Sequence, residues 1–398
     1  MTRRTTSPFL AHAREVLITE AVRTPMGRSH PQRGWFRDTH PNELLGRVYT
    51  ELLHRSGVDA ALIEDLVIGC TAPFGEQSRN VGRNAWLQMG YPPEVPAVTL
   101  DRRCGSAQTA VELAAGLIGT GTHDLVIAGG VEHMGHVPMN SPAAISELFG
   151  EPWPAALRER YAFVGQGESA ELIADQWGIG RREMDEFAVR SHQLAVEAIN
   201  AGRFDVEILP WELDGEVRKS DQTVRPGTST ESLEALTTVF RADGRITAGT
   251  SSPICDGASG VLLASRDAAE AHGLRVRARI LDQTTVGVDP IIMLTGPIPA
   301  TQKLLQRNGL TMDDIDLVEI NEAFSSVVIA WQRELGADMS RVNVNGGAIA
   351  LGHPVGATGG RLIATIVAEL ERRDAEIGLV TMCCGGGLGT ATLVQRID

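Results

Sequence analysis

The segment AVTLDRRCGSAQTAVELAAGLI, residues 97–118, joins a strand to a helix through a turn with one cysteine. Residues 97–100 are β-prone, and residues 107–118 carry small and apolar side chains at helical spacing. Cys104 therefore lies just before a predicted helix, where unpaired N–H groups and the helix dipole favour a thiolate. Such settings commonly lower a thiol pKa from about 8.5 to roughly 3.5–7.5. The alternative is a buried cysteine that only packs in the core.

The composition excludes several classes of protein. The 398 residues provide enough chain for two or three packed units. The net charge of −14 opposes nonspecific binding to nucleic acid, and no apolar run approaches the ~20 residues that span a bilayer. The five cysteines are irregularly spaced and form no CxxC pair. We therefore predict no metal, no nucleic-acid partner, no membrane span and a reducing, cytoplasmic location.

The back half of the chain repeats the plan of the front half. Residues 52–57 (LLHRSG) and 304–309 (LLQRNG) match at an offset of 252. Residues 98–130 and 342–387 both run as strand, glycine-containing turn, helix, apolar strand and glycines. Tryptophans, prolines and charged helices interrupt this alternation over residues 132–246, which indicates an inserted region. Apolar strands that alternate with helices predict an α/β protein with sheets covered on both faces.

In the second half, the side chains that could take part in catalysis follow predicted strands or lie in glycine-containing turns. His353 lies in the turn that corresponds to that of Cys104, so the duplication predicts that a neutral imidazole can take the thiol proton. Cys383 follows an apolar strand and precedes Gly385, one of three glycines whose N–H groups can stabilise an oxyanion. Asn321 follows another buried strand. Taken alone, these residues are also compatible with a core histidine, a packed thiol and a helix cap.

Four motifs in this order resemble those of the thiolase family: Cys104-Gly105-Ser106, Asn321-Glu322-Ala323-Phe324, Gly352-His353-Pro354 and Cys383-Cys384-Gly385-Gly386-Gly387. The likeness covers nearly the whole chain from Val16, and residues 131–139 are similar to degradative 3-ketoacyl-CoA thiolases. The resemblance implies the α/β thiolase fold, with duplicated βαβαβαββ halves in a five-layered α-β-α-β-α arrangement and an inserted loop domain. The expected domains are the first part of the N-terminal half (1–131), the loop domain over substrate and coenzyme A (132–246), the return of the N-terminal half (247–282) and the C-terminal half (283–398).

The resemblance also implies roles for the site residues. Cys104 matches the acylated nucleophile, and His353 matches the group that activates it. Cys383 matches the cysteine that moves a proton to or from the incoming thiol or the substrate. Asn321 matches the residue that holds a water beside His353 in one oxyanion hole. The N–H groups of Cys104 and Gly385 match the second oxyanion hole.

Other positions match the binding of coenzyme A or depart from the family pattern. Ser252 matches a serine near the pantetheine, and Arg225 matches an arginine beside the nucleotide. Cys384 is ambiguous, since many relatives have another residue there. Residues 164–171 (VGQGESAE) lack the His and Met that short-chain thiolases carry before Thr-Ala-Glu. This departure favours a longer or bulkier acyl group, such as a steroid side chain.

The activity implied by the resemblance is cleavage of a 3-ketoacyl-CoA by coenzyme A to acetyl-CoA and a shortened acyl-CoA, through an acyl-cysteine, in fatty-acid or steroid side-chain β-oxidation. Coenzyme A is then a co-substrate, and no tightly bound cofactor is expected. Expected partners are further copies of the chain, in a homodimer or homotetramer, and a multifunctional β-oxidation subunit. A biosynthetic acetoacetyl-CoA thiolase and a non-catalytic thiolase-like scaffold remain alternatives. The Cys383 loop argues against a ketoacyl-synthase-like condensing enzyme, and the lack of GxGxxG after a strand argues against an oxidoreductase.

Overall fold

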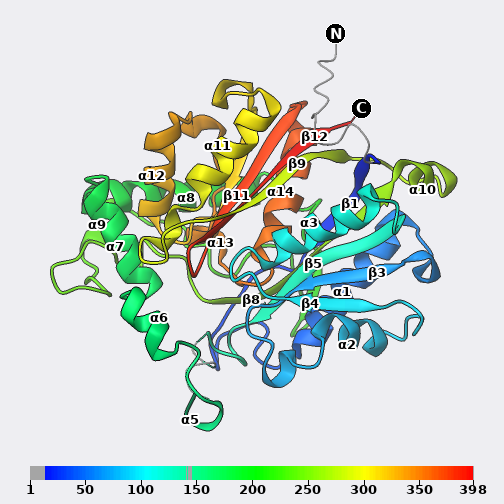
Figure 1. Ribbon diagram of the computed structural model, residues 1–398, viewed down its shortest axis with the longest axis horizontal. Helices are drawn as coiled ribbons and strands as arrows, with labels where there is room; N and C mark the ends of the chain where they lie inside the picture. The colour runs from blue at the N-terminus through cyan, green and yellow to red at the C-terminus, as the bar shows by residue number, and fades with distance from the viewer. Residues whose placement is uncertain (1–13, 140, 142–145, 398) are drawn as a thin grey trace.

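The computed structural model describes residues 14–139, 141 and 146–397, and its centre is a mixed sheet of ten strands (Figure 1). The first half contributes the order β4-β3-β5-β8-β1, and the second continues with β9-β12-β11-β10. The short strand β2 pairs with β8 at the side. The strands are β1 (Val16–Arg23), β2 (Gly27–Arg28), β3 (Asp65–Gly69), β4 (Ala97–Leu100), β5 (Leu125–His133), β8 (Cys255–Ser265), β9 (Ala278–Gly287), β10 (Leu317–Ile320), β11 (Ile377–Cys384) and β12 (Leu388–Arg396), with a separate hairpin of β6 (Trp211–Leu213) and β7 (Glu216–Arg218).

The sheets of the two halves meet at a short seam between β1 and β9. Only two residue pairs connect these strands, Leu17 with Arg279 and Ile18 with Ala278. In the first half, β3 is parallel to its neighbours β4 and β5, and β8 pairs antiparallel with β5. In the second half, β10 is parallel to β11, and β12 pairs antiparallel with β11. The carboxyl ends of the parallel strands in each half therefore share one edge of its sheet, where loops can build a site.

Helices form three layers around the two sheets. Helices α1 (Pro41–Ser56) and α2 (Val81–Gln88) cover the outer face of the first sheet, and α11 (Pro297–Asn308) and α12 (Ser325–Leu335) cover that of the second. Helix α3 (Ser106–Gly119) and the buried α14 (Thr358–Arg373) contact each other between the sheets. This is the five-layered α/β arrangement expected from the sequence. The other helices are α5 (Ser146–Phe149), α6 (Ala155–Arg160), α7 (Gln166–Gln176), α8 (Arg181–Asn200), α9 (Thr230–Glu234), α10 (Arg266–Ala271) and α13 (Ala348–Leu351).

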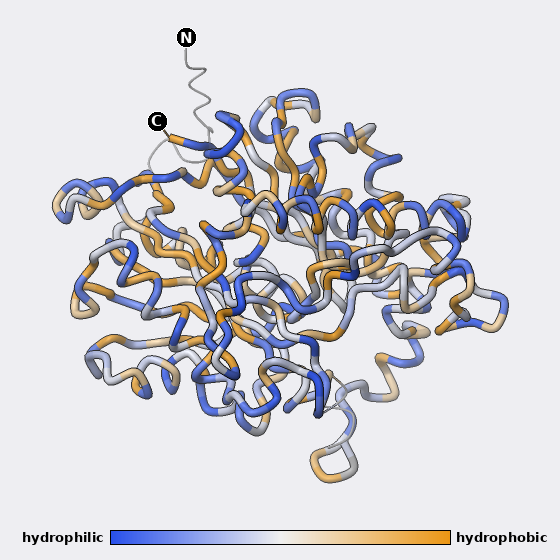
Figure 2. Tube along the Cα trace, turned by 180° about the vertical axis from the view of Figure 1, so that it is seen from behind, coloured by the Kyte–Doolittle hydropathy of each residue, from blue (hydrophilic) through white to orange (hydrophobic). Residues whose placement is uncertain are grey.

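The region between β5 and β8 lies at the side of these layers. Its helices α7 and α8 pack against α12, while α5 and α6 extend away from the sheet (Figure 1). Figure 2 shows apolar stretches through the centre of the molecule and polar stretches along the rim. In the described ranges, no helix has both the length and the apolar character needed to cross a membrane.

The second half departs from its predicted plan at residues 342–344, where a strand was expected. Val342 forms only an isolated bridge to Val318. The next residue, Asn343, has a left-handed backbone with φ of 45°, which ends the extended conformation. Its side chain accepts a hydrogen bond from the Ile320 N–H at 2.8 Å and donates one to the Ile320 carbonyl at 2.9 Å. The side chain thus takes the place of a strand ladder.

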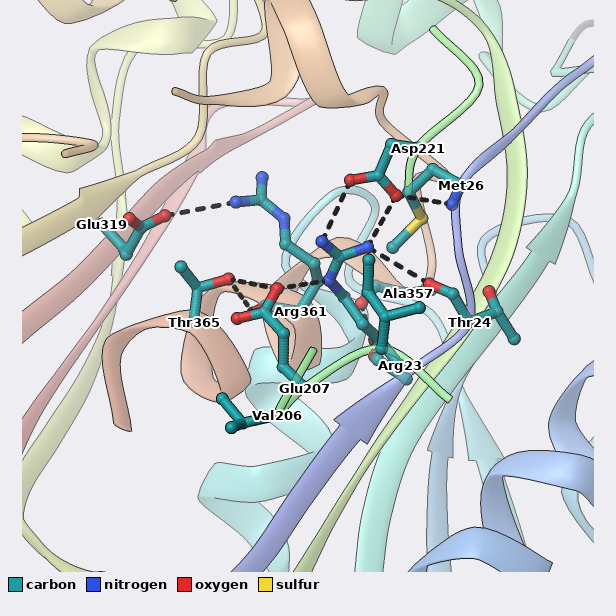
Figure 3. Close-up of polar contacts among 12 residues, drawn as sticks. Arg23, Thr24, Met26, Val206, Glu207, Asp221, Glu319, Ala357, Arg361 and Thr365 are labelled. Atoms are coloured by element: carbon teal, nitrogen blue, oxygen red, sulfur yellow. Dashed lines mark hydrogen bonds and ion pairs between the residues drawn. The ribbon is translucent and has the colours of Figure 1, made fainter. Parts of the chain in front are cut away.

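A buried ion-pair network connects the region between β5 and β8 to both halves (Figure 3). Arg23 of β1 contacts Glu207 at 2.6 Å and binds Asp221 through two nitrogens at 2.7 and 3.0 Å. On α14, the Thr365 hydroxyl donates to Glu207 at 3.1 Å, and Arg361 lies 3.2 Å from Glu319 of β10 in a second buried pair. Since these groups are almost fully buried, each charge depends on its partners for stabilisation.

Replacing Arg23 with Met should destabilise the protein by about 3 to 5 kcal/mol, because it leaves the Glu207 and Asp221 carboxylates buried without their cation. The midpoint of urea unfolding measures this effect. The matched control is Arg182→Met, which removes an exposed pair with Glu186 on α8 and should change the midpoint little. Equal shifts for the two variants would contradict a structural role for the buried network.

Candidate active site

Cys104 lies in the turn between β4 and α3, two residues before the first helical residue. Its side chain is 2% exposed. Burial raises the pKa of the Cys104 thiol to about 11, although the N–H group of Gly385 and the charge of Arg103 act in the opposite direction. The expected lowering of this pKa is therefore wrong, because the loss of solvation outweighs the helix N-terminus. The resting side chain of Cys104 is a neutral thiol, which would need a base to react as a nucleophile.

His353 is buried in the loop that leads into α14, and its hydrogen bonds define its tautomer. The Thr358 hydroxyl donates its proton to the Pro354 carbonyl at 2.9 Å. The same hydroxyl lies 2.6 Å from His353 Nδ1, and with its own proton on Pro354 it accepts there, so we assign the ring proton to Nδ1. Burial, together with the charge of Arg361, lowers the pKa of His353 to about 3. The imidazole is thus neutral, and its basic nitrogen is Nε2.

Asn321 and Cys383 lie at the ends of adjacent parallel strands. Ile320 of β10 pairs with Thr381 of β11, and the Asn321 N–H donates to the Thr381 carbonyl at 3.1 Å. The Asn321 side-chain nitrogen is 3.4 Å from His353 Nε2 and can donate to it. Its Oδ1 atom is buried and has no partner among the described residues. A buried amide oxygen left unpaired in this way is suited to hold a water or substrate group.

The two adjacent cysteines of β11 alternate between the faces of the strand. Cys383 belongs to the core of the second half, and burial raises its pKa well above the usual range, with Cys104 and Cys384 adding to the shift. Cys384 belongs to the central core, where a β-carbon on Gly105 would lie 2.6 Å from its Sγ atom. The Cys383 and Cys384 thiols therefore both lie near the Cys104 turn, although they project from opposite faces of β11.

Small residues and one carboxylate allow the two halves of the chain to approach each other closely near Cys104. A β-carbon on Gly359 would lie 2.3 Å from the Gln108 nitrogen, so the starts of α14 and α3 nearly touch. The buried Glu132 of β5 accepts the N–H groups of Thr71 at 2.8 Å and of Gly356 at 2.9 Å through Oε2. Neither Glu132 nor Thr358 was expected from the sequence to belong to the site. The only signal was position, since Glu132 ends an apolar strand and Thr358 follows His353 by five residues.

Arg225 lines a groove whose wall also includes the residues on either side of Ser252. A cavity of about 190 Å³ is lined by residues that include Arg225, Ser251 and Pro253, on either side of Ser252. The Ser252 N–H donates to the Ala323 carbonyl at 3.0 Å, so this loop is joined directly to the Asn321 segment. Within the described ranges, no cluster of three His, Cys, Asp or Glu side chains is arranged to hold a metal ion.

A larger cavity of about 610 Å³ opens beside the Cys104 turn. Gly385, whose N–H group interacts with the Cys104 thiol, is part of its wall. The rest of the lining is mostly apolar and includes Met134, Trp153, Phe163, Phe240, Met293 and Phe324. A cavity with these walls is suited to a hydrocarbon group attached to a reacting carbon at Cys104.

Alkylation of Cys104 by iodoacetamide should accelerate about tenfold per pH unit from pH 6 to pH 9, because a thiol of pKa about 11 is ionised in proportion to hydroxide over this range. His353, with its pKa near 3, should add no inflection. The measurement is labelling of the Cys104 peptide by mass spectrometry, with Cys104→Ser as the unlabelled control. A rate that levels off near pH 7 would show an ionised resting thiol and contradict this assignment.

Comparisons with known proteins agree with this architecture. Residues 16–267 match the thiolase N-terminal domain, and residues 274–396 match the thiolase C-terminal domain. The chain is 43% identical to the steroid 3-ketoacyl-CoA thiolase FadA6 of Mycobacterium tuberculosis, over 96% of this chain and 94% of that one. It is 45% identical to a 3-ketoacyl-CoA thiolase of Shewanella loihica, over 96% and 100% of the two chains. The crystal structure of the Bacillus anthracis acetyl-CoA acetyltransferase superposes with a TM-score of 0.88 at 35% identity, covering 97% of this chain and 100% of that one. The predicted fold is thereby confirmed, and the chain belongs to the thiolase family.

Proposed function

We propose that this protein cleaves 3-ketoacyl-CoA with coenzyme A, giving acetyl-CoA and an acyl-CoA shortened by two carbons, as a degradative thiolase. The observation that carries the proposal is that Cys104 interacts with both Cys383 and the N–H group of Gly385, and that Gly385 lines a mostly apolar cavity. The names of the relatives support the same reaction. The 610 Å³ cavity supports an acyl group larger than acetyl.

The first half-reaction needs a base for the neutral nucleophile. We assign this task to His353, whose unprotonated Nε2 accepts the Cys104 proton while Nδ1–H stays bonded to Thr358. The thiolate then attacks C3 of the substrate. After the transfer, Nε2–H becomes a donor, and with a water held by Asn321 it stabilises the oxygen on the departing acetyl-CoA enolate.

Cys383 provides the proton that the carbon leaving group requires. When the C2–C3 bond breaks, its electron pair moves to C2, and the Cys383 thiol protonates that carbon to give acetyl-CoA. The acyl group remains on Cys104, with its carbonyl oxygen facing the N–H groups of Gly385 and Cys104. In the second half-reaction, coenzyme A gives its proton to the Cys383 thiolate, and its sulfur attacks this thioester. Cys104 leaves as a thiolate and takes back the proton that His353 Nε2 holds, so both cysteines return to the thiol form and His353 is neutral again.

Coenzyme A is proposed to lie along the groove that contains Ser252 and Arg225. Ser252 is adjacent to the Asn321 segment, as a group near the pantetheine must be. Arg225 is exposed at the outer end, and its N–H donates to the buried His192 at 3.2 Å. An exposed guanidinium there suits the phosphates of a nucleotide. Coenzyme A is then consumed as a substrate and is not a resident cofactor.

The assembly and surroundings of the protein form the last part of the proposal. Strand β4 is an edge of the sheet and exposes Val98 to 45%, so it can pair with a second copy in a homodimer, from which a homotetramer can be built. All five cysteines are free, which supports a reducing, cytoplasmic setting. We retain the domain bounds 1–131, 132–246, 247–282 and 283–398 and a multifunctional β-oxidation subunit as a partner.

Steady-state thiolysis of 3-ketoacyl-CoA substrates, from four carbons to steroid-sized acyl groups, tests the proposed reaction directly. The specificity constant should be higher for substrates longer than acetoacetyl-CoA, because the apolar cavity binds the additional carbons. A preference for acetoacetyl-CoA would indicate the biosynthetic alternative. Absence of turnover with every substrate would indicate a non-catalytic scaffold.

Cysteine variants separate the two assigned thiols. Cys104→Ala should abolish thiolysis while coenzyme A still binds. Cys383→Ala should also stop thiolysis, because C2 cannot be protonated, yet an acyl-CoA should still acylate Cys104, as measured by intact-protein mass. Cys384→Ala is the matched control and should retain thiolysis. If Cys384→Ala blocks only the carbon step and Cys383→Ala does not, their roles are reversed.

A further inference from the structure

Among the polar residues that line the large cavity, which include Thr71, Glu132 and Glu168, two carry N–H hydrogen-bond donors close to Cys104. Arg103 and Gln166 line the cavity from opposite segments, the Cys104 turn and the first residue of α7. Both approach Gly385. A β-carbon on Gly385 would lie 2.8 Å from the Gln166 side-chain nitrogen and 3.8 Å from Arg103 Cγ. The cavity therefore contains a guanidinium and an amide next to the site of acylation.

The position of Arg103 is imposed by the turn itself. Its backbone has φ of 51°, a left-handed conformation that is uncommon for a residue with a long side chain. Its N–H donates to Asp101 at 2.7 Å, and its carbonyl accepts the hydroxyls of Ser106 at 2.6 Å and Thr71 at 3.2 Å. These bonds hold the strained residue in place, so its side chain leaves the turn in one direction, past Gly385.

The carboxylates near the cavity leave Arg103 without a close partner. Glu132 accepts several backbone and side-chain donors, and Glu168 is paired with Arg241 through short bonds. Among the described residues, the Arg103 guanidinium pairs with one carboxylate, that of Asp101 at 3.5 Å, and the side chain is 51% exposed. The Gln166 amide has no hydrogen-bond partner in the same described part of the chain. These donors are therefore available to a ligand with acceptor atoms.

We propose that Arg103 and Gln166 bind a carboxylate on the acyl group, so that the substrates include 3-ketoacyl-CoA molecules that carry a second acid group beyond the reacting ketone. This inference rests on the proposed function and names its substrate class. A planar guanidinium can bind both oxygens of a carboxylate, and the amide adds a third donor. The surrounding apolar residues hold the connecting carbons.

The test compares matched substrate pairs of equal carbon number. One member of each pair is a 3-ketoacyl-CoA that ends in a methyl group, and the other ends in a carboxylate, at lengths of six, eight and ten carbons. The ratio of their specificity constants is measured for the wild-type enzyme, Arg103→Met, Arg103→Lys and Gln166→Met. At the best length, the wild type should prefer the acid.

Arg103→Met should lower the specificity constant for the acid roughly ten- to hundredfold and change that for the methyl-ended substrate little, which is the size of effect expected for a charge-assisted hydrogen bond in a cavity. Arg103→Lys should restore part of the preference, because it keeps the charge without the planar fork. Gln166→Met should give a smaller loss in the same direction. These losses should appear mainly in KM.

The matched control is Arg102→Met, which removes the neighbouring cation. Arg102 does not line the cavity and is bonded instead to Thr285 at 2.7 Å and paired with Glu112 at 3.5 Å. Its replacement should leave the substrate ratio unchanged. If Arg102→Met changed the ratio of specificity constants as much as Arg103→Met does, the preference for the acid would come from the general positive potential near the turn. That result would overturn the assignment to Arg103.

The remaining outcomes separate this inference from the proposed function. If the wild type cleaves neither member of any pair, the thiolase reaction itself fails. If it cleaves the methyl-ended substrates at least as well as the acids at every length, only the acid site fails. If Arg103→Met lowers kcat for both members equally, Arg103 acts on the Cys104 thiol and the acid site is again refuted.

Discussion

The carboxylate of Glu132 is the interaction on which the geometry of the site depends. It projects from the end of a strand of the first half and accepts the N–H group of Gly356, in the loop that carries His353. Its other acceptor positions hold residues 71–72, beside the Cys104 turn. One buried carboxylate thus joins the segment beside Cys104 to the loop that carries His353. An aliphatic residue at this position would leave several buried N–H groups without an acceptor.

Around this carboxylate the backbone is packed so closely that several positions accept only glycine. A β-carbon on Gly130 would lie 2.0 Å from the Gly356 carbonyl, and one on Gly356 would lie 2.5 Å from the Glu132 side chain. The two halves therefore meet backbone to backbone, without intervening side chains. This closeness explains why Cys104 and His353 are desolvated, and why the thiol and the imidazole are both neutral at rest.

Much of this arrangement was predictable from the sequence, and the exceptions have physical causes. Apolar strands and glycine turns are local patterns, so the α/β layers and the positions of Cys104, Asn321 and Cys383 at strand ends follow from them. The pKa of Cys104 was mispredicted because burial is a property of the whole fold, and a helix N-terminus in the sequence says nothing of it. The bend at Asn343 depends on a long-range bond to Ile320, which no local pattern encodes.

The Arg23 network has a consequence for how the molecule opens. Glu207 and Asp221 are held by the buried guanidinium of Arg23 on β1. The segments that contain these two carboxylates therefore cannot detach unless the buried ion pairs are broken. Their amide hydrogens should therefore exchange with solvent only through global unfolding. Helices α5 and α6 have no fully buried residue among those described, and their amides can exchange through local fluctuations. The chain segment between β5 and β8 thus contains parts that should exchange slowly and parts that should exchange rapidly.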